Sequence, residues 1–197
     1  MMKLFLATGN EHKIKEMKQM LSNTKIKVLC KDDFAKLPEV IEDKETFKGN
    51  ALKKARKLCD YLQLPTIADD SGLVVDVLDG QPGVYSARFA GQDASDKENN
   101  DKLLKLLEGV KEEKRLAHFT CAMAFVTPEG REEIVIGKSA GKIALAPHGK
   151  AGFGYDPLFI PQGYDKSFAQ LGSKIKNKIS HRANALVKMK QILLEYR

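Results

Sequence analysis

A polar segment, TGNEHK from Thr8 to Lys13, follows the first apolar run of the chain and precedes a predicted helix. Where a strand ends and a helix begins, free backbone N–H groups attract an anion. Lys13 would add a positive charge for a phosphate, and Asn10 could hold the turn or donate to an oxygen. The segment therefore suits phosphate binding, although a plain turn with Asn10 as a helix cap and Lys13 in solvent explains the same residues.

Two adjacent carboxylates, Asp69 and Asp70, follow a short apolar run that begins at Thr66. Neighbouring side chains of an extended chain face opposite ways, so we expect only one of them to enter a given pocket. That aspartate could hold Mg²⁺, which takes few protein carboxylates and keeps its other positions for water and phosphate. A surface turn is the alternative. A nearby acidic run could supply a second ligand or be a solvated loop: Glu39, Glu42, Asp43 and Glu45.

Two later segments carry groups suited to a planar base. In GFGYDP, which begins at Gly152, Phe153 or Tyr155 could stack on a ring, and the carboxylate could accept a hydrogen bond. In KIKNKISHRANAL, a Ser-His-Arg sequence lies beside lysines and offers donors for keto oxygens or phosphates. The alternatives are a turn with aromatic rings packed inward and a capped helix start with surface charge.

Two common phosphate-binding motifs are excluded. A P-loop around Gly137 would need an earlier glycine where Glu132 stands, and the glycine pattern that opens at Gly152 ends on Pro157. A P-loop ATPase or a Rossmann dehydrogenase is therefore not expected.

The composition points to one domain rather than two, because 197 residues with 43% hydrophobic content fill a single core. A net charge of +7 favours polyanionic partners. Because the basic residues are spread along predicted helices and aromatic residues make up only 7%, we expect no nucleic-acid partner. The start of the chain lacks the apolar stretch of a signal peptide or membrane span, and the three cysteines form no C-x-x-C pair. We therefore expect a cytoplasmic protein with buried thiols and no membrane partner.

Strands and helices alternate along the chain, which predicts a mixed α/β protein. The strand that starts at Thr66 is expected to break at DDSG. Apolar residues alternate in the strand 116–126, so we expect one of its faces to be buried and the other exposed. A hairpin turn is expected to follow that strand at PEGR. Other predicted strands cover 3–7 and 26–30, and predicted helices start near residue 11 and cover 46–62, 95–107 and 175–196.

Six ordered segments resemble the inosine triphosphate pyrophosphatase family, the XTP/dITP pyrophosphatases, over residues 4–186. The segments are TGNEHK, TFKGNALKKA, IADDSGL, GQPGVYSARFAG, GFGYDPLFIP and ISHRANAL. The resemblance implies an α/β fold, with an elongated mixed β-sheet flanked by helices, and two lobes with a central active-site cleft. It also implies that residues 1–197 form one two-lobed nucleotide pyrophosphatase domain, which assembles as a homodimer.

The resemblance also implies a role for each matching residue. Asp70 would be metal ligand and general base, and Glu42, or alternatively Glu39, the second metal carboxylate. Lys13 would act in catalysis as well as in phosphate binding. The substrate would contact Thr8, Gly9, Asn10, Glu11, His12, Lys13, Lys54, Ser71, Phe153, Gly154, Tyr155, Asp156, Lys176, His181 and Arg182.

The implied reaction is the Mg²⁺-dependent hydrolysis of ITP, dITP and XTP to a monophosphate and pyrophosphate, by attack of water on the α-phosphorus. Such an enzyme removes non-standard purines from the nucleotide pool. Donors from His181 or Arg182 would select a 6-oxo group over the amino group of adenine.

One residue departs from the family pattern TFxENA, because this chain reads TFKGNA with Gly49 in place of glutamate. Loss of that carboxylate could weaken metal binding, or Glu45 could compensate. A nucleotide-binding protein without catalysis is therefore a second hypothesis. A nucleic-acid-binding module, suggested only by the positive charge, is a third.

Overall fold

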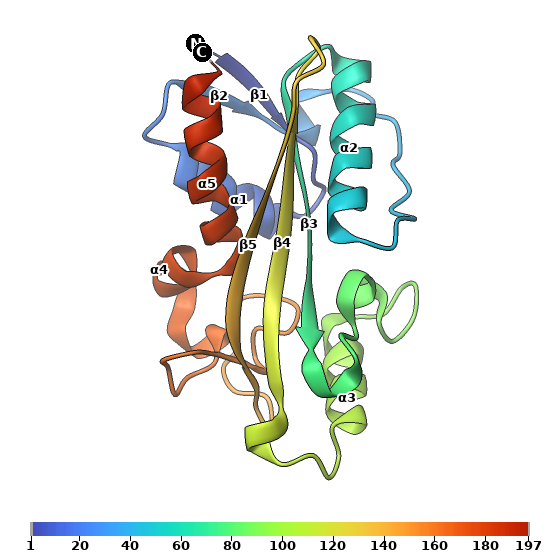
Figure 1. The fold of residues 1–197 in the computed structure, drawn as a ribbon, viewed down its shortest axis with the longest axis vertical. Helices are drawn as coiled ribbons and strands as arrows, with labels where there is room; N and C mark the ends of the chain where they lie inside the picture. The colour runs from blue at the N-terminus through green and yellow to red at the C-terminus, as the bar shows by residue number, and fades with distance from the viewer. Residues whose placement is uncertain (1, 197) are drawn as a thin grey trace. The chain divides into compact units, whose positions relative to one another are not determined.

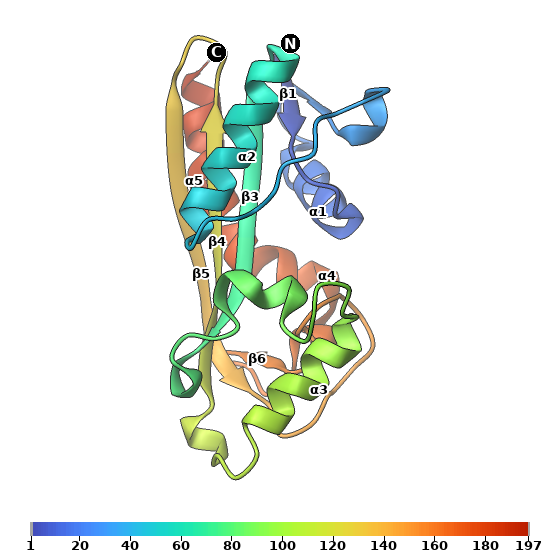
Figure 2. The ribbon, with the colours of Figure 1, turned by 90° about the vertical axis from the view of Figure 1, so that its right-hand side faces the viewer.

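The computed structural model describes residues 2–196, except for the side chains of His12 and Met20. The chain divides into two compact units, drawn in Figures 1 and 2. Unit 1 contains the residues up to 70, residues 121–137 and those from 184 on, and unit 2 contains residues 71–120 and 138–183. Strands β3 (Thr66–Val75), β4 (Leu116–Val126) and β5 (Glu132–Ile143) each start in one unit and end in the other.

The strands form one mixed sheet in the order β2-β1-β3-β4-β5-β6. In unit 1, β1 (Met2–Leu6) pairs in parallel with β2 (Ile26–Leu29) and with the start of β3. In unit 2, the end of β5 pairs antiparallel with β6 (Phe159–Pro161). The prediction of an α/β protein with a mixed sheet flanked by helices is confirmed.

Helices cover both faces of the sheet in unit 1. One apolar cluster joins the strands to α1 (Glu11–Leu21) and α5 (His181–Glu195), and the other joins them to α2 (Phe47–Leu62). Figure 1 shows α5 and α2 on opposite sides of the strands. These faces are buried because apolar residues three and four apart share one side of a helix.

Unit 2 has a core of its own, built from β-strand residues, α3 (Asp96–Leu106) and α4 (Phe168–Ile179). Phe119, Phe159 and Phe168 meet in it, with ring centroids 4.7 to 6.2 Å apart. Short 3₁₀ turns complete the chain at Lys31–Asp33, Asp76–Leu78, Gly83–Arg88 and Glu112–Lys114.

At two predicted helix starts a side chain caps the helix. Thr46 accepts the Gly49 N–H at the start of α2. Ser95 accepts the Glu98 N–H at the start of α3, where the Glu98 carboxylate accepts in return. These helices therefore begin within a residue of the predicted positions.

Two predictions about the strands were wrong. Strand β3 does not break at DDSG but continues to Val75, and both aspartates on it are buried. Strand β4 is not half-buried, because Cys121 and Met123 pack into one cluster of unit 1 while Ala122 and Ala124 pack into the other. A strand covered by helices on both faces carries apolar residues at successive positions.

The predicted C-terminal helix 175–196 is two helices, α4 and α5, separated at Ser180. The backbone of Ser180 is extended, and its hydroxyl accepts the N–H of Ala183. A serine that caps the next helix offers the backbone an alternative to continuing the previous one. His181 therefore opens α5 rather than lying inside a longer helix.

Cys30, Cys59 and Cys121 are buried free thiols, as predicted. Burial first, and then the charges of Asp60 and Glu129, raise the pKa of the Cys59 thiol to about 11. A protonated thiol is a poor nucleophile, so Cys59 has the character of a packing residue rather than a reactive one.

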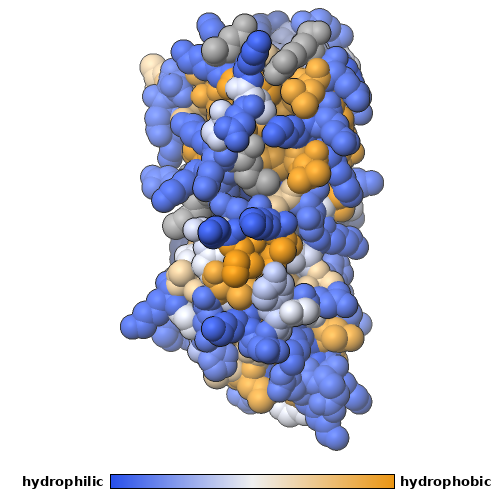
Figure 3. Space-filling view, turned by 90° about the vertical axis from the view of Figure 1, so that its left-hand side faces the viewer, coloured by the Kyte–Doolittle hydropathy of each residue, from blue (hydrophilic) through white to orange (hydrophobic). Residues whose placement is uncertain are grey.

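Among the described residues, no helix combines the length and apolar character that a membrane span requires. On the face drawn in Figure 3, hydrophilic residues cover most of the surface, and apolar residues appear in small groups between them.

Candidate functional site

The TGNEHK segment connects β1 to α1 in unit 1. Asn10 caps α1 by accepting the Lys13 N–H at 3.2 Å, and Thr8 accepts the Asn10 N–H at 3.2 Å. Gly9 and Glu11 are exposed, and the side chain of His12 lies outside the described residues. The interpretation of Asn10 as a cap is therefore correct, and the segment has the geometry of a strand-to-helix turn.

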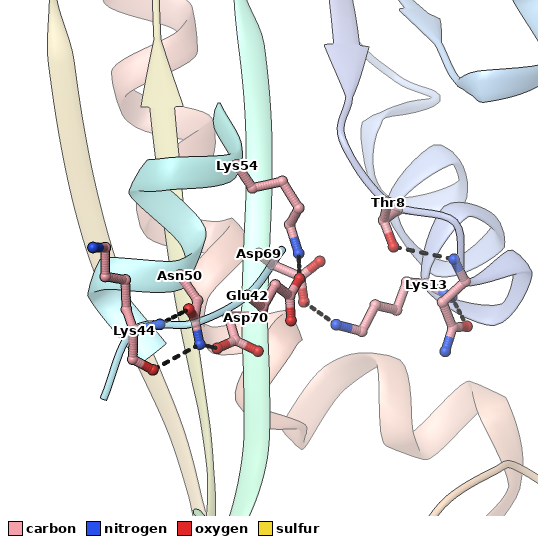
Figure 4. A network of polar contacts seen from close by, with 9 residues as sticks. Thr8, Lys13, Glu42, Lys44, Asn50, Lys54, Asp69 and Asp70 are labelled. Atoms are coloured by element: carbon pink, nitrogen blue, oxygen red, sulfur yellow. Dashed lines mark hydrogen bonds and ion pairs between the residues drawn. The ribbon is translucent and has the colours of Figure 1, made fainter. Parts of the chain in front are cut away.

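Lys13 does not point into solvent. Its ammonium group lies 2.7 Å from Asp69 of β3, a carboxylate that is only 1% exposed. Sequence reasoning assigned no individual role to Asp69, which binds Lys13 from a position 56 residues away in the chain. Figure 4 shows this side chain reaching from α1 toward the strand.

A second lysine enters the same part of unit 1 from α2. Lys54 forms an ion pair with Glu42, which lies in the loop before that helix. Burial opposes the charge on Lys54, but the carboxylates of Asp69 and Glu42 outweigh it and raise the pKa of the lysine. Lys54 therefore stays protonated at neutral pH, as a phosphate-binding group must.

Asp70, the neighbour of Asp69 on β3, is buried and accepts a hydrogen bond of 2.9 Å from Asn50 of α2. Asn50 also binds both backbone groups of Lys44, at 2.8 and 3.2 Å, so one amide ties Asp70 to the loop that carries Glu42. Sequence reasoning missed Asn50, although it lies in the TFKGNALKKA segment.

The environment of Asp70 disfavours its negative charge. Burial raises the pKa of this carboxyl most, the Asn50 hydrogen bond lowers it, and the charge of Glu42 raises it again, so the net shift is upward. Two carboxylates that repel each other in a buried site gain stability from a cation between them. Figure 4 shows the Asp69 carboxylate turned toward Lys13 and the Asp70 carboxylate turned toward Asn50, with Glu42 drawn next to them.

Mg²⁺ fits this donor set. The described residues contain no group of three or more His, Cys, Asp or Glu side chains able to hold a metal, so a cage made only of protein is not present in that part of the chain. Mg²⁺ is instead bound by one or two carboxylates together with substrate phosphates. Glu42 meets that requirement better than the exposed Glu39, whose backbone carbonyl accepts from Lys57.

The other predicted site residues gather in unit 2. Asp156 and Lys176 form a buried ion pair of 2.7 Å, and the same carboxylate oxygen accepts the Phe153 N–H at 3.0 Å. Gly152 has a φ of +84°, and a Cβ atom there would lie 2.1 Å from the Asp156 carboxylate. The loop can therefore close over Asp156 only with glycine at position 152.

The two aromatic residues of the loop have different roles. Tyr155 is buried and donates its hydroxyl to the Ser86 carbonyl at 2.9 Å, while burial raises its pKa. Phe153 is half-buried, and the Lys176 ammonium lies 4.3 Å from its ring centroid. The interpretation of an inward-packed ring thus holds for Tyr155, which leaves Phe153 as the candidate for stacking on a base.

His181 and Arg182 are buried, so their interpretation as surface charge was wrong. The His181 ring stacks on Phe119 at 4.7 Å, and the Arg182 guanidinium lies 5.7 Å from the Phe153 centroid. Arg182 therefore lies next to Phe153, as Lys176 does.

Ser71 lies half-buried on β3, directly after Asp70.

Comparisons with known proteins agree with one another. The model of the Ham1 family matches residues 4–192. The dITP/XTP pyrophosphatase of Geobacter sulfurreducens is 46% identical over 193 residues, covering 98% of this chain and 97% of the relative. That of Thermoanaerobacter pseudethanolicus is 47% identical over 194 residues, covering 98% of each chain.

Solved structures are similar over the same length. A HAM1 protein from Coxiella burnetii superposes with a TM-score of 0.91 at 38% identity, covering 99% of this chain and 100% of the other. A nucleoside-triphosphatase, also titled dITP/XTP pyrophosphatase, from Mycobacterium abscessus gives a TM-score of 0.78 at 40% identity, covering 95% and 97%.

Proposed function

This chain belongs to the Ham1 family, and we propose that it hydrolyses the triphosphates of non-standard purine nucleosides, such as ITP, dITP and XTP, to a monophosphate and pyrophosphate. The observation that carries the proposal is the group of two lysines and three carboxylates in unit 1: Lys13, Lys54, Glu42, Asp69 and Asp70. The curated relatives named dITP/XTP pyrophosphatase support the choice of substrate.

The lysines bind the triphosphate. Lys13 and Lys54 come from two different helices and lie near the same buried carboxylates, so their charges converge on one region. When a triphosphate arrives, its oxygens replace or share the carboxylate partners of these lysines. The charge on the phosphates is thereby neutralised before the reaction begins.

Asp70 acts on the attacking water. Its raised pKa makes it a stronger base than an ordinary aspartate, and it would accept a proton from the water that attacks the α-phosphorus. The bond to the bridging oxygen then breaks and pyrophosphate leaves. Asn50 keeps the Asp70 carboxylate in one orientation throughout.

Glu42 and Asp70 would hold Mg²⁺, whose contribution is to neutralise charge on the reacting phosphates. The protein supplies two carboxylates from separate segments, and the substrate supplies further oxygen ligands. Repulsion between these carboxylates in the free protein supports the assignment, since it is relieved by a cation.

The group in unit 2 would recognise the base. Phe153 offers a half-buried ring for stacking, and Lys176 and Arg182 are buried donors next to it. His181 is a third buried donor, stacked on Phe119. A 6-oxo group accepts hydrogen bonds from such donors, whereas the amino group of adenine would face them as another donor. The selection removes deaminated purines before they enter nucleic acids.

The test is pyrophosphate release from ITP, dITP, XTP, GTP and ATP at equal concentrations, with and without Mg²⁺. We expect turnover of the first three to exceed that of ATP by at least about a hundredfold, because a site built for a hydrogen bond rejects the analogue that cannot make it. Equal rates for ITP and ATP would contradict the substrate assignment. Binding of ITP without turnover would favour the non-catalytic hypothesis raised by Gly49.

Gly49 leads to a second prediction. It is the third residue of α2, and its N–H is held by Thr46. In Gly49→Glu the added carboxylate would favour a cation near Asn50 and Asp70, so we expect the Mg²⁺ concentration for half-maximal activity to fall by roughly tenfold. Titration of activity with Mg²⁺ measures it.

Gly49→Gln is the matched control, because it has the same shape without the charge. Both side chains must displace Lys44, whose Cβ lies 2.9 Å from a Cβ built at position 49. If the glutamine variant shifts the Mg²⁺ titration as far as the glutamate variant, the charge of the side chain is not the cause.

We also propose that the protein is a cytoplasmic homodimer. The support for the location is the composition of the chain. Light scattering on the purified protein measures its molar mass, and a dimer would have twice the 21.9 kDa of one chain.

A further inference from the structure

One glycine of the GFGYDP loop is held on both sides of its backbone by α3. The Asp96 carboxylate accepts the Gly154 N–H at 2.6 Å, and the Asn100 side-chain amide donates to the Gly154 carbonyl at 2.9 Å. Asp96 and Asn100 are one helical turn apart, so their side chains lie on the same face of α3. Two side chains of one helix thus bind both polar backbone groups of a single residue.

Gly154 needs an external constraint. Its φ is +60°, a backbone conformation that glycine adopts more readily than other residues. Glycine loses more conformational freedom on ordering than any other residue. The two hydrogen bonds from α3 therefore restrict the backbone of Gly154 and, through it, the position of the neighbouring Phe153.

Asn100 is well suited to impose that constraint. It is buried, and its amide nitrogen donates both to the Gly154 carbonyl and, at 2.8 Å, to the Asp96 carbonyl. Its Oδ1 atom is buried with no hydrogen-bond partner among the described residues. A buried acceptor without a donor destabilises the fold, so the presence of asparagine here is explained by the two hydrogen bonds that its amide nitrogen donates.

We infer that Asn100 and Asp96 are positioning residues for base recognition, which hold the Phe153–Asp156 loop of the proposed active site through Gly154 and so determine the affinity for the purine. The inference rests on the proposed function. It extends that function to α3, a helix in which sequence reasoning found no site residue. The neighbouring Asn99 similarly binds the Ala87 carbonyl and the Ala90 N–H.

The experiment separates base recognition from phosphate binding. The KM for ITP reports on both, whereas the inhibition constant of inorganic tripolyphosphate, which has no base, reports on the phosphate site alone. For Asn100→Leu and Asp96→Ala we expect the KM for ITP to rise roughly tenfold, as loss of a buried or charge-assisted hydrogen bond implies. We expect tripolyphosphate inhibition to be unchanged.

Asp101→Ala is the matched control, because Asp101 lies on the same helix, is exposed, and forms an ion pair with the likewise exposed Lys97. It removes the same charge as Asp96→Ala and should leave the KM unchanged. Asp96→Asn keeps an acceptor oxygen for Gly154 and should return the KM most of the way to that of the native protein.

Several results would overturn the inference. These are a native KM in both variants, a tripolyphosphate constant that rises in step with the KM, or an Asp96→Asn variant as impaired as Asp96→Ala. If Asn100→Leu does not fold, the Asp96→Ala variant tests the inference alone, since Asp96 is exposed and its replacement leaves no buried group changed. Failure of the native protein to hydrolyse ITP would instead overturn the proposed function, and that result is known before any variant is made.

Discussion

Replacement of Asp70 by asparagine is expected to reduce pyrophosphate release from ITP on the order of a thousandfold, because a positioned general base contributes factors of that size. Asparagine has nearly the same shape, and its carbonyl oxygen can accept the Asn50 amide that now binds Asp70. The loss would therefore reflect the missing base and metal ligand rather than a changed fold. Single-turnover rates with saturating Mg²⁺ and ITP measure it.

The same substitution should make the protein more stable without ligands. The pKa of Asp70 is raised in the fold above its ordinary value of 3.8, mainly by burial, so its ionisation opposes folding at neutral pH. Below the unfolded pKa both states carry a neutral carboxyl, and the penalty disappears. We therefore expect a higher melting temperature for Asp70→Asn at pH 7 and no difference from the native protein near pH 3.

Asp60→Asn is the control for both measurements, since Asp60 is an exposed aspartate at the end of α2. It should change neither activity nor the pH dependence of stability. An Asp70→Asn variant with native turnover would exclude Asp70 as the base. A variant that loses activity but also melts lower at pH 7 would contradict the account of a carboxylate held in an unfavourable environment.

Replacement of Lys176 by methionine is expected to destabilise the protein by about 3 kcal/mol, because it removes a cation that pairs with the buried Asp156 carboxylate. The side chains of this pair are only 6% and 3% exposed, so water can do little to replace the lysine. For a chain of this size, such a change lowers the melting temperature by about 10 °C. Calorimetry or thermal circular dichroism measures it.

Two further variants identify the cause. Lys178→Met removes an exposed lysine from the same helix and should have little effect. Adding Asp156→Asn to Lys176→Met removes the buried charge as well, so it should recover much of the lost stability. If the double variant is less stable than Lys176→Met alone, the buried charge of Asp156 is not the source of the destabilisation.

The local elements followed from the sequence wherever short-range periodicity and capping decide them. Ile14, Met17 and Leu21 share the buried face of α1, and Thr46 and Ser95 begin their helices. These features depend on residues within one or two turns, which lie next to one another in the sequence. The order of the six motifs also predicted the family, and the family in turn predicted the reaction.

Contacts between distant residues were beyond sequence reasoning. The break at Ser180 depends on which of two helices its hydroxyl caps, and the continuity of β3 depends on partners for two buried aspartates. Those partners, Lys13 and Asn50, lie 56 and 20 residues away from the aspartates they bind. No local pattern indicates such a pair.

The sequence by itself determined the residue types that could bind a phosphate, a cation and a base, and the order in which they occur. Only the tertiary structure decided that Asp69 holds Lys13 while Asp70 meets Asn50, that Tyr155 packs inward while Phe153 does not, and that α3 fixes Gly154. The physical reason is that burial and long-range hydrogen bonds set the charge and direction of a side chain, and both arise only when segments far apart in the chain pack together.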